Sequence, residues 1–178
     1  MIIVLTQPFF FSSEAEKIVG MLQNGIADII HIRKPQSTIA EMQQLIEQLP
    51  HSVYDKIVLH DHHSLALKYN LRGVHLNSRN PQPPANFSGT ISISCHSINE
   101  LEEQKRRPFT YLSLSPIFDS ISKKDYKSAF TEHEIEKARQ QGIIDYRVMA
   151  LGGVTFDKVE KVKQMGFGGA MILGDAWR

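Results

Sequence analysis

The sequence predicts an α/β fold, specifically a closed (β/α)₈ barrel, because short apolar runs alternate with helical patterns along the whole chain. The runs are dense in Ile, Val, Leu and Tyr, as expected of strands buried on both faces. Strand–helix repeats imply parallel pairing with right-handed crossovers. An open doubly wound sheet is the alternative. The eight runs are Ile2–Leu5, Asp28–Ile32, Lys56–His60, Gly73–Leu76, Thr90–Ser94, Thr110–Leu114, Arg147–Leu151 and Gly169–Leu173.

Helix starts between these runs are marked by Ser/Thr-x-x-Glu sequences, in which the two side chains can cap each other's backbone N–H groups. Apolar residues at helical spacing follow two of them, including Ile18 and Leu22 in the first and Leu45 and Leu49 in the second. The four expected capping boxes are Ser13–Glu16, Thr38–Glu41, Ser97–Glu100 and Thr131–Glu134.

Two features make the predicted barrel a trimmed one. The segment Asn77–Gly89 is too rich in proline for a normal fourth helix, and the sequence ends at Arg178, soon after the eighth strand, with no eighth helix. No linker or low-complexity tract interrupts the pattern. We therefore expect a single domain spanning residues 1–178.

Composition limits the function classes. Lys and Arg number 20 against 19 Asp and Glu, so the formal charge of +1 gives no basis for binding nucleic acid or an anionic membrane. The single cysteine cannot form an internal disulfide, and the first residues lack the basic region of a signal peptide. No apolar stretch reaches the ~18 residues of a membrane span. We expect a soluble, cytoplasmic protein.

The carboxyl ends of the strands carry polar residues, and in (β/α)₈ barrels this end holds the active site. Arg33 and Lys34 follow the second strand, where a guanidinium and an ammonium suit phosphate oxygens. A solvated pair of cations in the next loop is the alternative interpretation. The third strand ends in His60-Asp61-His62-His63.

This histidine-rich run permits two metals. His60 and His62 are expected to project together from extended chain, as a zinc site requires, although a third ligand must come from elsewhere. Asp61 suits Mg²⁺, which prefers one or two carboxylates together with substrate phosphate oxygens. Alternatively, Asp61 caps the helix that begins near Ser64. We favour magnesium over zinc.

Three later segments suit phosphate. The loop from Ser115 to Phe130 alternates hydroxyls with amines at Ser120, Ser122 and Lys123. Gly152-Gly153 ends the seventh strand and Leu173-Gly174 the eighth, where backbone N–H groups can approach an anion closely. Two tight turns are the alternative, but the agreement of adjacent loops favours phosphate.

In order along the chain, these strand ends resemble the thiamine phosphate synthase/TenI family of (β/α)₈, or TIM, barrels. The family's Gln-x-Arg-x-Lys and Asn-Asp motifs are similar to His31-Ile32-Arg33-Lys34-Pro35 and His60-Asp61. Its Gly-Val-His-Leu-Gly-Gln-x-Asp motif is similar to the segment from Gly73 to Asn80. Its later motifs are similar to Ser94, to Ser115-Pro116-Ile117-Phe118 with Ser120-Ile121-Ser122-Lys123, and to Leu151-Gly152-Gly153.

The resemblance implies a transferase of thiamine biosynthesis, which joins hydroxymethylpyrimidine diphosphate to thiazole phosphate and releases pyrophosphate. Its implied partners are these small phosphates, and its implied cofactor is Mg²⁺ on Asp61 and Asn80. Arg33, His60 and Lys123 would hold the pyrimidine diphosphate, and Ser94 would touch the pyrimidine side. His31 and Lys34 are also expected to bind substrate. The implied thiazole phosphate ligands are Ser120, Ser122, Gly152, Gly153, Leu173 and Gly174.

The departures from the family pattern fall mainly on the pyrimidine diphosphate half. His31 replaces Gln, Pro35 replaces Lys, His60 replaces Asn, and Asn80 replaces the second acidic metal ligand, which weakens Mg²⁺ binding. Three alternatives to the synthase stay open. They are a TenI-like thiazole tautomerase, a non-catalytic thiazole or thiamine phosphate binder, and a hydrolase with zinc at His60–His63. The tautomerases of the family carry a His at the position of Pro116 in this chain. A barrel flank exposed by a missing helix favours a homodimer.

Overall fold

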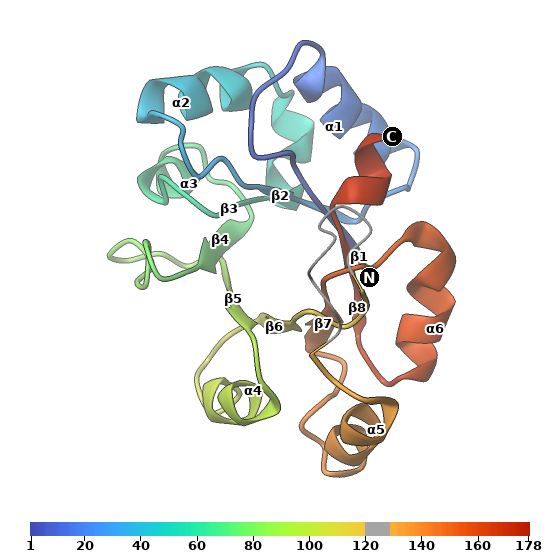
Figure 1. Ribbon diagram of the computed structural model, residues 1–178. Helices are drawn as coiled ribbons and strands as arrows, with labels where there is room; N and C mark the ends of the chain where they lie inside the picture. The colour runs from blue at the N-terminus through green and yellow to red at the C-terminus, as the bar shows by residue number, and fades with distance from the viewer. Residues whose placement is uncertain (120–128) are drawn as a thin grey trace. The chain divides into compact units, whose positions relative to one another are not determined.

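The computed structural model describes residues 1–119 and 129–178 (Figure 1). Its eight strands follow one another in chain order in a closed parallel barrel. The (β/α)₈ prediction is confirmed. Every expected strand is present, with ends that differ by no more than one residue. The strands are β1 (Ile2–Leu5), β2 (Ile29–Ile32), β3 (Ile57–Leu59), β4 (Gly73–Leu76), β5 (Thr90–Cys95), β6 (Tyr111–Leu114), β7 (Val148–Ala150) and β8 (Gly169–Ile172).

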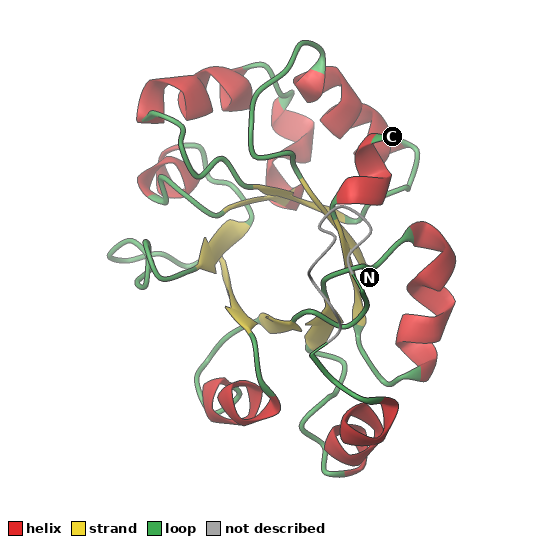
Figure 2. Ribbon diagram, viewed as in Figure 1, coloured by secondary structure: helices red, strands yellow, loops and turns green. Residues whose placement is uncertain are grey.

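Helices alternate with these strands along the chain (Figure 2). As predicted, the described segment between β4 and β5 forms no helix. A short 3₁₀ helix follows β8. The α-helices are α1 (Glu14–Gln23), α2 (Ile39–Glu47), α3 (Ser64–Lys68), α4 (Ile98–Gln104), α5 (Glu132–Gln140) and α6 (Val159–Gln164). The 3₁₀ helices are η1 (His51–Lys56), η2 (Phe156–Lys158) and η3 (Gly174–Trp177).

The expected capping boxes form at α2 and α5 only. At both helices the threonine accepts from the glutamate N–H, and the glutamate accepts from the threonine N–H. At α4, Ser97 accepts from the Glu100 N–H, but the Glu100 carboxylate turns to the N–H of His96. The box predicted at Ser13 is wrong, because that residue has a φ of 63° and makes no side-chain cap bond.

The chain divides into two compact units. We call Ile3–Ile91 the N-terminal unit, and Met1–Ile2 together with Ser92–Arg178 the C-terminal unit. In the N-terminal unit, β1 to β4 pair in parallel, with His31 opposite Val58 and Leu59 opposite Val74. The strands are buried on both faces, and α1 to α3 lie on one side of them (Figure 1).

The C-terminal unit pairs β5 to β8 in the same parallel manner. Its first residue belongs to the ladder, because the Ala170 N–H donates to the Met1 carbonyl at 3.0 Å. The interior positions of β6 and β8 are fully buried, which accounts for their near-continuous apolar sequences. Among the described residues, no helix has the length and apolar character needed to cross a membrane.

Candidate functional site

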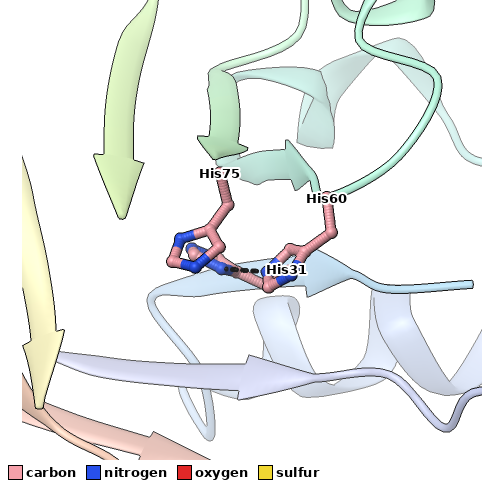
Figure 3. Close-up of side chains that lie close together, drawn as sticks. All are labelled: His31, His60 and His75. Atoms are coloured by element: carbon pink, nitrogen blue, oxygen red, sulfur yellow. Dashed lines mark hydrogen bonds between the residues drawn. The ribbon is translucent and has the colours of Figure 1, made fainter. Parts of the chain in front are cut away.

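Three histidines converge at the carboxyl ends of β2, β3 and β4 in the N-terminal unit (Figure 3). His31 lies within β2, His75 lies within β4, and His60 directly follows β3. The Nδ1 of His31 and the Nε2 of His60 share a hydrogen bond of 2.8 Å. The rings of His60 and His75 stack with their centroids 4.2 Å apart. We call His31, His60 and His75 the histidine cluster.

Burial keeps this cluster uncharged. Each imidazole is at most 4% exposed, and loss of hydration lowers the pKa of His31, of His60 and of His75, the last to about 3. The positive charge of Arg33 further lowers the pKa of His60 and His75. At neutral pH the cluster therefore offers neutral ring nitrogens rather than cations.

Asp61 follows the cluster and is 6% exposed. Its Oδ1 accepts from Arg79 Nη2 at 3.0 Å and from Asn80 Nδ2 at 3.2 Å. Its Oδ2 is buried and has no hydrogen-bond partner among the described residues. The Asn80 amide also donates to the carbonyl of His60, so it presents nitrogen rather than oxygen to this carboxylate. A buried carboxylate oxygen without a donor is costly unless a cation or a ligand contacts it.

Arg33 and Lys34, neighbours in sequence, have different environments. Arg33 is half-buried, and within the described part of the chain its guanidinium makes no hydrogen bond or ion pair. Lys34 is completely buried, and its Nζ donates to the carbonyls of Gln7 and Phe9 and to Glu14 Oε1, at 2.9, 2.6 and 2.6 Å. An ammonium has three donors, so Lys34 has none left for a substrate.

The expectation that His60 and His62 project together is wrong. His62 has a φ of 53°, and its Nε2 lies 2.8 Å from the carbonyl of Ser37. The left-handed backbone turns this side chain toward the start of α2, away from extended geometry. His63 instead contacts β4, with its Nε2 3.2 Å from the carbonyl of His75.

In the C-terminal unit, serines gather at the ends of β5 and β6. Ser113 donates to the Oγ of Ser94 at 3.0 Å, and the Oγ of Ser115 lies 3.2 Å from His96 Nδ1. These hydroxyls are buried or half-buried at the end of the strands where the sequence predicts substrate contacts. Ser94 thus lies in a polar group of side chains, and its contact with the pyrimidine stays a prediction.

Both glycines after β7 have conformational reasons to be glycine. Gly152 and Gly153 have φ values of 89° and 63°. A Cβ on Gly152 would lie 2.7 Å from Pro116 Cα, and one on Gly153 would lie 2.6 Å from the Phe118 carbonyl oxygen. At the end of β8, by contrast, a Cβ on Gly174 would meet nothing within 4 Å. The fold itself requires the first two glycines, whereas Gly174 borders open space beside Leu173.

Three polar residues of these strand ends were missed by sequence reasoning. Arg79 pairs with Asp61, although it lies in the proline-rich segment where no helix or strand is expected. Lys158 donates to the Gly153 carbonyl at 2.8 Å, and the Oγ1 of Thr155 is buried without a partner among the described residues. The only available signal was their position a few residues after β4 or β7. Ser120, Ser122 and Lys123 lie outside the described residues.

Two clefts among the described residues are lined mainly by helices rather than by the strand ends. One of about 470 Å³ is bordered by α4 and α5 of the C-terminal unit, including Glu134 and Lys137. Another involves η1 and Tyr69 in the N-terminal unit. Neither includes a predicted site residue, so the chemistry of the strand ends, rather than cleft size, identifies the candidate site.

Comparison with known proteins identifies the family of this chain. The family model for thiamine monophosphate synthase matches residues 1–174. The thiamine-phosphate synthase of Halalkalibacterium halodurans is 27% identical over 150 residues, which cover 80% of this chain and 70% of the relative. That of Proteus mirabilis is 28% identical over 127 residues, covering 66% of this chain and 57% of the relative.

A solved structure extends the likeness to the whole fold. The thiamine phosphate pyrophosphorylase of Bacteroides thetaiotaomicron is 39% identical, with a TM-score of 0.89, and the match covers 99% of this chain and 84% of that one. The family match spans both units and includes every strand end described above. The chain therefore belongs to the thiamine monophosphate synthase family.

Proposed function

We propose that this chain is a thiamine-phosphate synthase, a transferase that joins hydroxymethylpyrimidine diphosphate to thiazole phosphate and releases pyrophosphate. Family membership and relatives named for this activity support the assignment. The observation that carries it is the buried Oδ2 of Asp61, which has no partner among the described residues at the end of β3. An acceptor of this kind suits a cation that accompanies a diphosphate substrate.

Synthases of this family use Mg²⁺, and Asp61 fits that ion. Magnesium is bound through one or two carboxylates and substrate phosphate oxygens, and one carboxylate oxygen here has no other ligand among the described residues. Asn80 fits less well, because its amide nitrogen faces Asp61. When bound, the ion would neutralise charge on the leaving diphosphate. We therefore assign Mg²⁺ to Asp61 and leave Asn80 the role of orienting that carboxylate.

Arg33 is our candidate for binding the diphosphate. Its guanidinium has no carboxylate partner among the described residues, and the neighbouring imidazoles are neutral. A planar guanidinium can donate two parallel N–H bonds to phosphate oxygens. As the bond between the pyrimidine methylene carbon and the diphosphate oxygen breaks, the electron pair passes to that oxygen. Arg33 would then bind the leaving group more tightly than the substrate, which lowers the barrier.

The new bond forms when the thiazole nitrogen donates its lone pair to the same methylene carbon. We assign the thiazole phosphate to the backbone around Gly153 and Leu173-Gly174. Ser120 and Ser122, which lie outside the described residues, are the predicted hydroxyl donors. Support comes from the open space beside Gly174 and from Lys158, which brings a cation to the turn after β7. We also propose that the protein acts in the cytoplasm.

The tautomerase alternative is disfavoured by the electrostatics of the histidine cluster. Proton transfer near neutral pH needs a group whose pKa lies near neutral. Burial lowers the pKa of His31, His60 and His75 well away from that range. The relatives described above are also named as synthases or pyrophosphorylases.

The decisive experiment measures pyrophosphate release with each substrate alone and with both, with and without Mg²⁺. A synthase requires both substrates and the metal. Asp61→Asn should lower kcat at least about 100-fold, because metal-assisted stabilisation of a leaving group contributes several kcal/mol. The matched control is Asp55→Asn, which neutralises an exposed carboxylate of the same unit.

Unchanged pyrophosphate release by the Asp61→Asn variant would show that Asp61 takes no part in the reaction. A complete absence of release, with thiazole phosphate still raising the melting temperature, would replace the synthase by the binder alternative. Metal-independent aromatisation of the thiazole, without pyrophosphate, would establish a tautomerase instead.

A further inference from the structure

We propose that the histidine cluster is a binding site for a borderline transition-metal ion, of which Zn²⁺ is the representative, distinct in chemistry from the Mg²⁺ position at Asp61. Three ligating nitrogens, one each from His31, His60 and His75, lie within 4.8 Å of one another (Figure 3). They come from three consecutive strands, so the barrel backbone itself holds the ligands together.

The donor set selects the class of metal. Imidazole nitrogens suit Zn²⁺, Co²⁺, Ni²⁺ and Cu²⁺, whereas Mg²⁺ prefers oxygen. The cluster contains nitrogen ligands only, and the neighbouring Asp61 supplies oxygen. The two positions therefore discriminate between borderline and hard cations, and occupation of one does not imply occupation of the other.

The three imidazoles must rearrange before they can hold one ion, because their ligating nitrogens lie up to 4.8 Å apart. Two nitrogens bound to one tetrahedral Zn²⁺, each at about 2.0–2.1 Å, lie roughly 3.3 Å apart. His31 Nδ1 and His60 Nε2, at 2.8 Å, would have to separate, and the stacked rings of His60 and His75, with an interplanar angle of 21°, would have to rotate so that their nitrogens converge on the ion. The proton between the two facing nitrogens would move to the other nitrogen of its ring, so every imidazole stays neutral and no proton is lost.

Three protein ligands leave one position of a tetrahedral site for an external ligand. Its charge follows from the surroundings. Arg33 acts on His60 and His75 as a positive charge, and the three imidazoles supply no negative charge. A bound divalent cation would therefore favour an anion in the fourth position, such as hydroxide or a phosphate oxygen.

The test uses the full chain without an affinity tag, because a polyhistidine tag binds the same metals. The protein is stripped with a chelator, which is then removed, and Co²⁺ is added without substrate. We expect a visible absorption spectrum typical of tetrahedral Co²⁺, saturating at one ion per chain, displaced by Zn²⁺ and unaffected by excess Mg²⁺. X-ray absorption of the Zn²⁺ form should show imidazole nitrogens at about 2.0–2.1 Å.

Two variants test the ligands with side chains of the type that related synthases carry at these positions. His31→Gln and His60→Asn should each weaken Zn²⁺ binding more than about 100-fold, since loss of a partner outside the ligand shell alone costs 10- to 100-fold. His133→Gln, at an exposed position on α5, is the matched control and should bind as the unmodified chain does.

The proposal is overturned if the unmodified chain binds no Co²⁺ or Zn²⁺, or if both cluster variants bind as tightly as His133→Gln. An X-ray absorption spectrum without imidazole ligands overturns it even if the variants fail to fold. These measurements omit substrate, so they are independent of whether the chain releases pyrophosphate.

Discussion

Lys34 and Glu14 form an ion pair from which water is excluded, with side chains 0% and 2% exposed. Burial raises the pKa of Glu14 and lowers that of Lys34, and the hydrogen bond between them only partly opposes both shifts. Burial thus disfavours the charged form of each side chain, and the opposite charge of its partner partly offsets that cost. In such pairs the removal of one partner is far more costly than the pair itself is stabilising.

The first prediction is that Lys34→Met destabilises the protein by about 3–5 kcal/mol at pH 7, because Glu14 is left as an unpaired buried charge. Because the pKa of Glu14 is higher in the folded state than in the unfolded state, where it is about 4.5, the carboxyl is protonated and uncharged at low pH. The loss of stability is therefore small below pH 4.5 and grows as pH rises through the folded-state pKa. Urea unfolding at pH 7 and pH 4.5, against the unmodified chain at each pH, measures it. A deficit equal at both pH values would contradict this explanation.

The histidine cluster makes stability sensitive to acid. The three histidines have lower pKa values in the folded state than in the unfolded state, where the pKa is about 6.5. Their contribution to the free energy of unfolding is therefore fully present above pH 6.5 and is lost as pH falls toward the folded-state pKa values. With up to three protons taken up on unfolding, the free energy of unfolding should fall by roughly 4 kcal/mol per pH unit below about pH 6.

The second prediction is that His60→Asn removes one of these protons and lowers that slope by about 1.4 kcal/mol per pH unit. The measurement is urea unfolding between pH 4.5 and 7 with a chelator present, so that bound metal does not contribute. His133→Gln, at its exposed position, serves for comparison. Equal slopes for all three proteins would mean that the cluster is protonated in the folded chain.

At the scale of the element, helix starts with the same sequence pattern differ in the bonds they make. Thr38 begins α2 with extended backbone and a complete capping box. Ser13, before α1, has a φ of 63°, outside the extended region of a normal N-cap, and its side chain makes no cap bond. The pattern Ser/Thr-x-x-Glu is thus sufficient for a cap only when the chain enters the helix in extended conformation.

The third prediction follows from this difference. Thr38→Ala should destabilise the protein by about 1 kcal/mol, because an N–H at the start of α2 loses its acceptor. Ser13→Ala removes a hydroxyl without a cap bond and should change the free energy of unfolding by much less. The midpoints of urea unfolding compare the two. A larger loss for Ser13→Ala would show that its hydroxyl stabilises the chain in another way.

At the scale of the whole molecule, the two substrates have different requirements. The pyrimidine diphosphate is assigned to Arg33 and to Mg²⁺ on Asp61, and the thiazole phosphate to backbone groups after β7 and β8. Each ligand should stabilise the folded chain by mass action, by about 2.7 kcal/mol at one hundred times its dissociation constant. For a chain of this length that corresponds to a rise in Tm of roughly 5–11 °C.

The fourth prediction is that only one of these shifts depends on the metal. A chelator, or Asp61→Asn, should abolish most of the shift from the pyrimidine diphosphate and leave that from thiazole phosphate unchanged. Thermal unfolding followed by fluorescence provides the measurement, with Asp55→Asn as the control. If both shifts disappear with the metal, the assignment of Mg²⁺ to the pyrimidine half alone is wrong.

Much of the fold follows from local patterns. Buried parallel strands require continuous apolar runs, so their positions could be predicted to within a residue, as β4 (Gly73–Leu76) illustrates. The helix-free stretch after β4 could be predicted because proline lacks the N–H that a helix needs. Membership of the family agrees with the order of motifs at the strand ends.

The sequence by itself determined the order of strands and helices, the family, and which polar side chains lie at the strand ends. Only the tertiary structure decided what those side chains contact. Lys34 meets Glu14 across 20 residues, and His31 meets His60 across 29. Local patterns record the periodicity of burial, whereas the pairing of buried charges and rings depends on the strand register and on rotamers selected by packing. For that reason the histidine cluster could not be predicted from His60-Asp61-His62-His63.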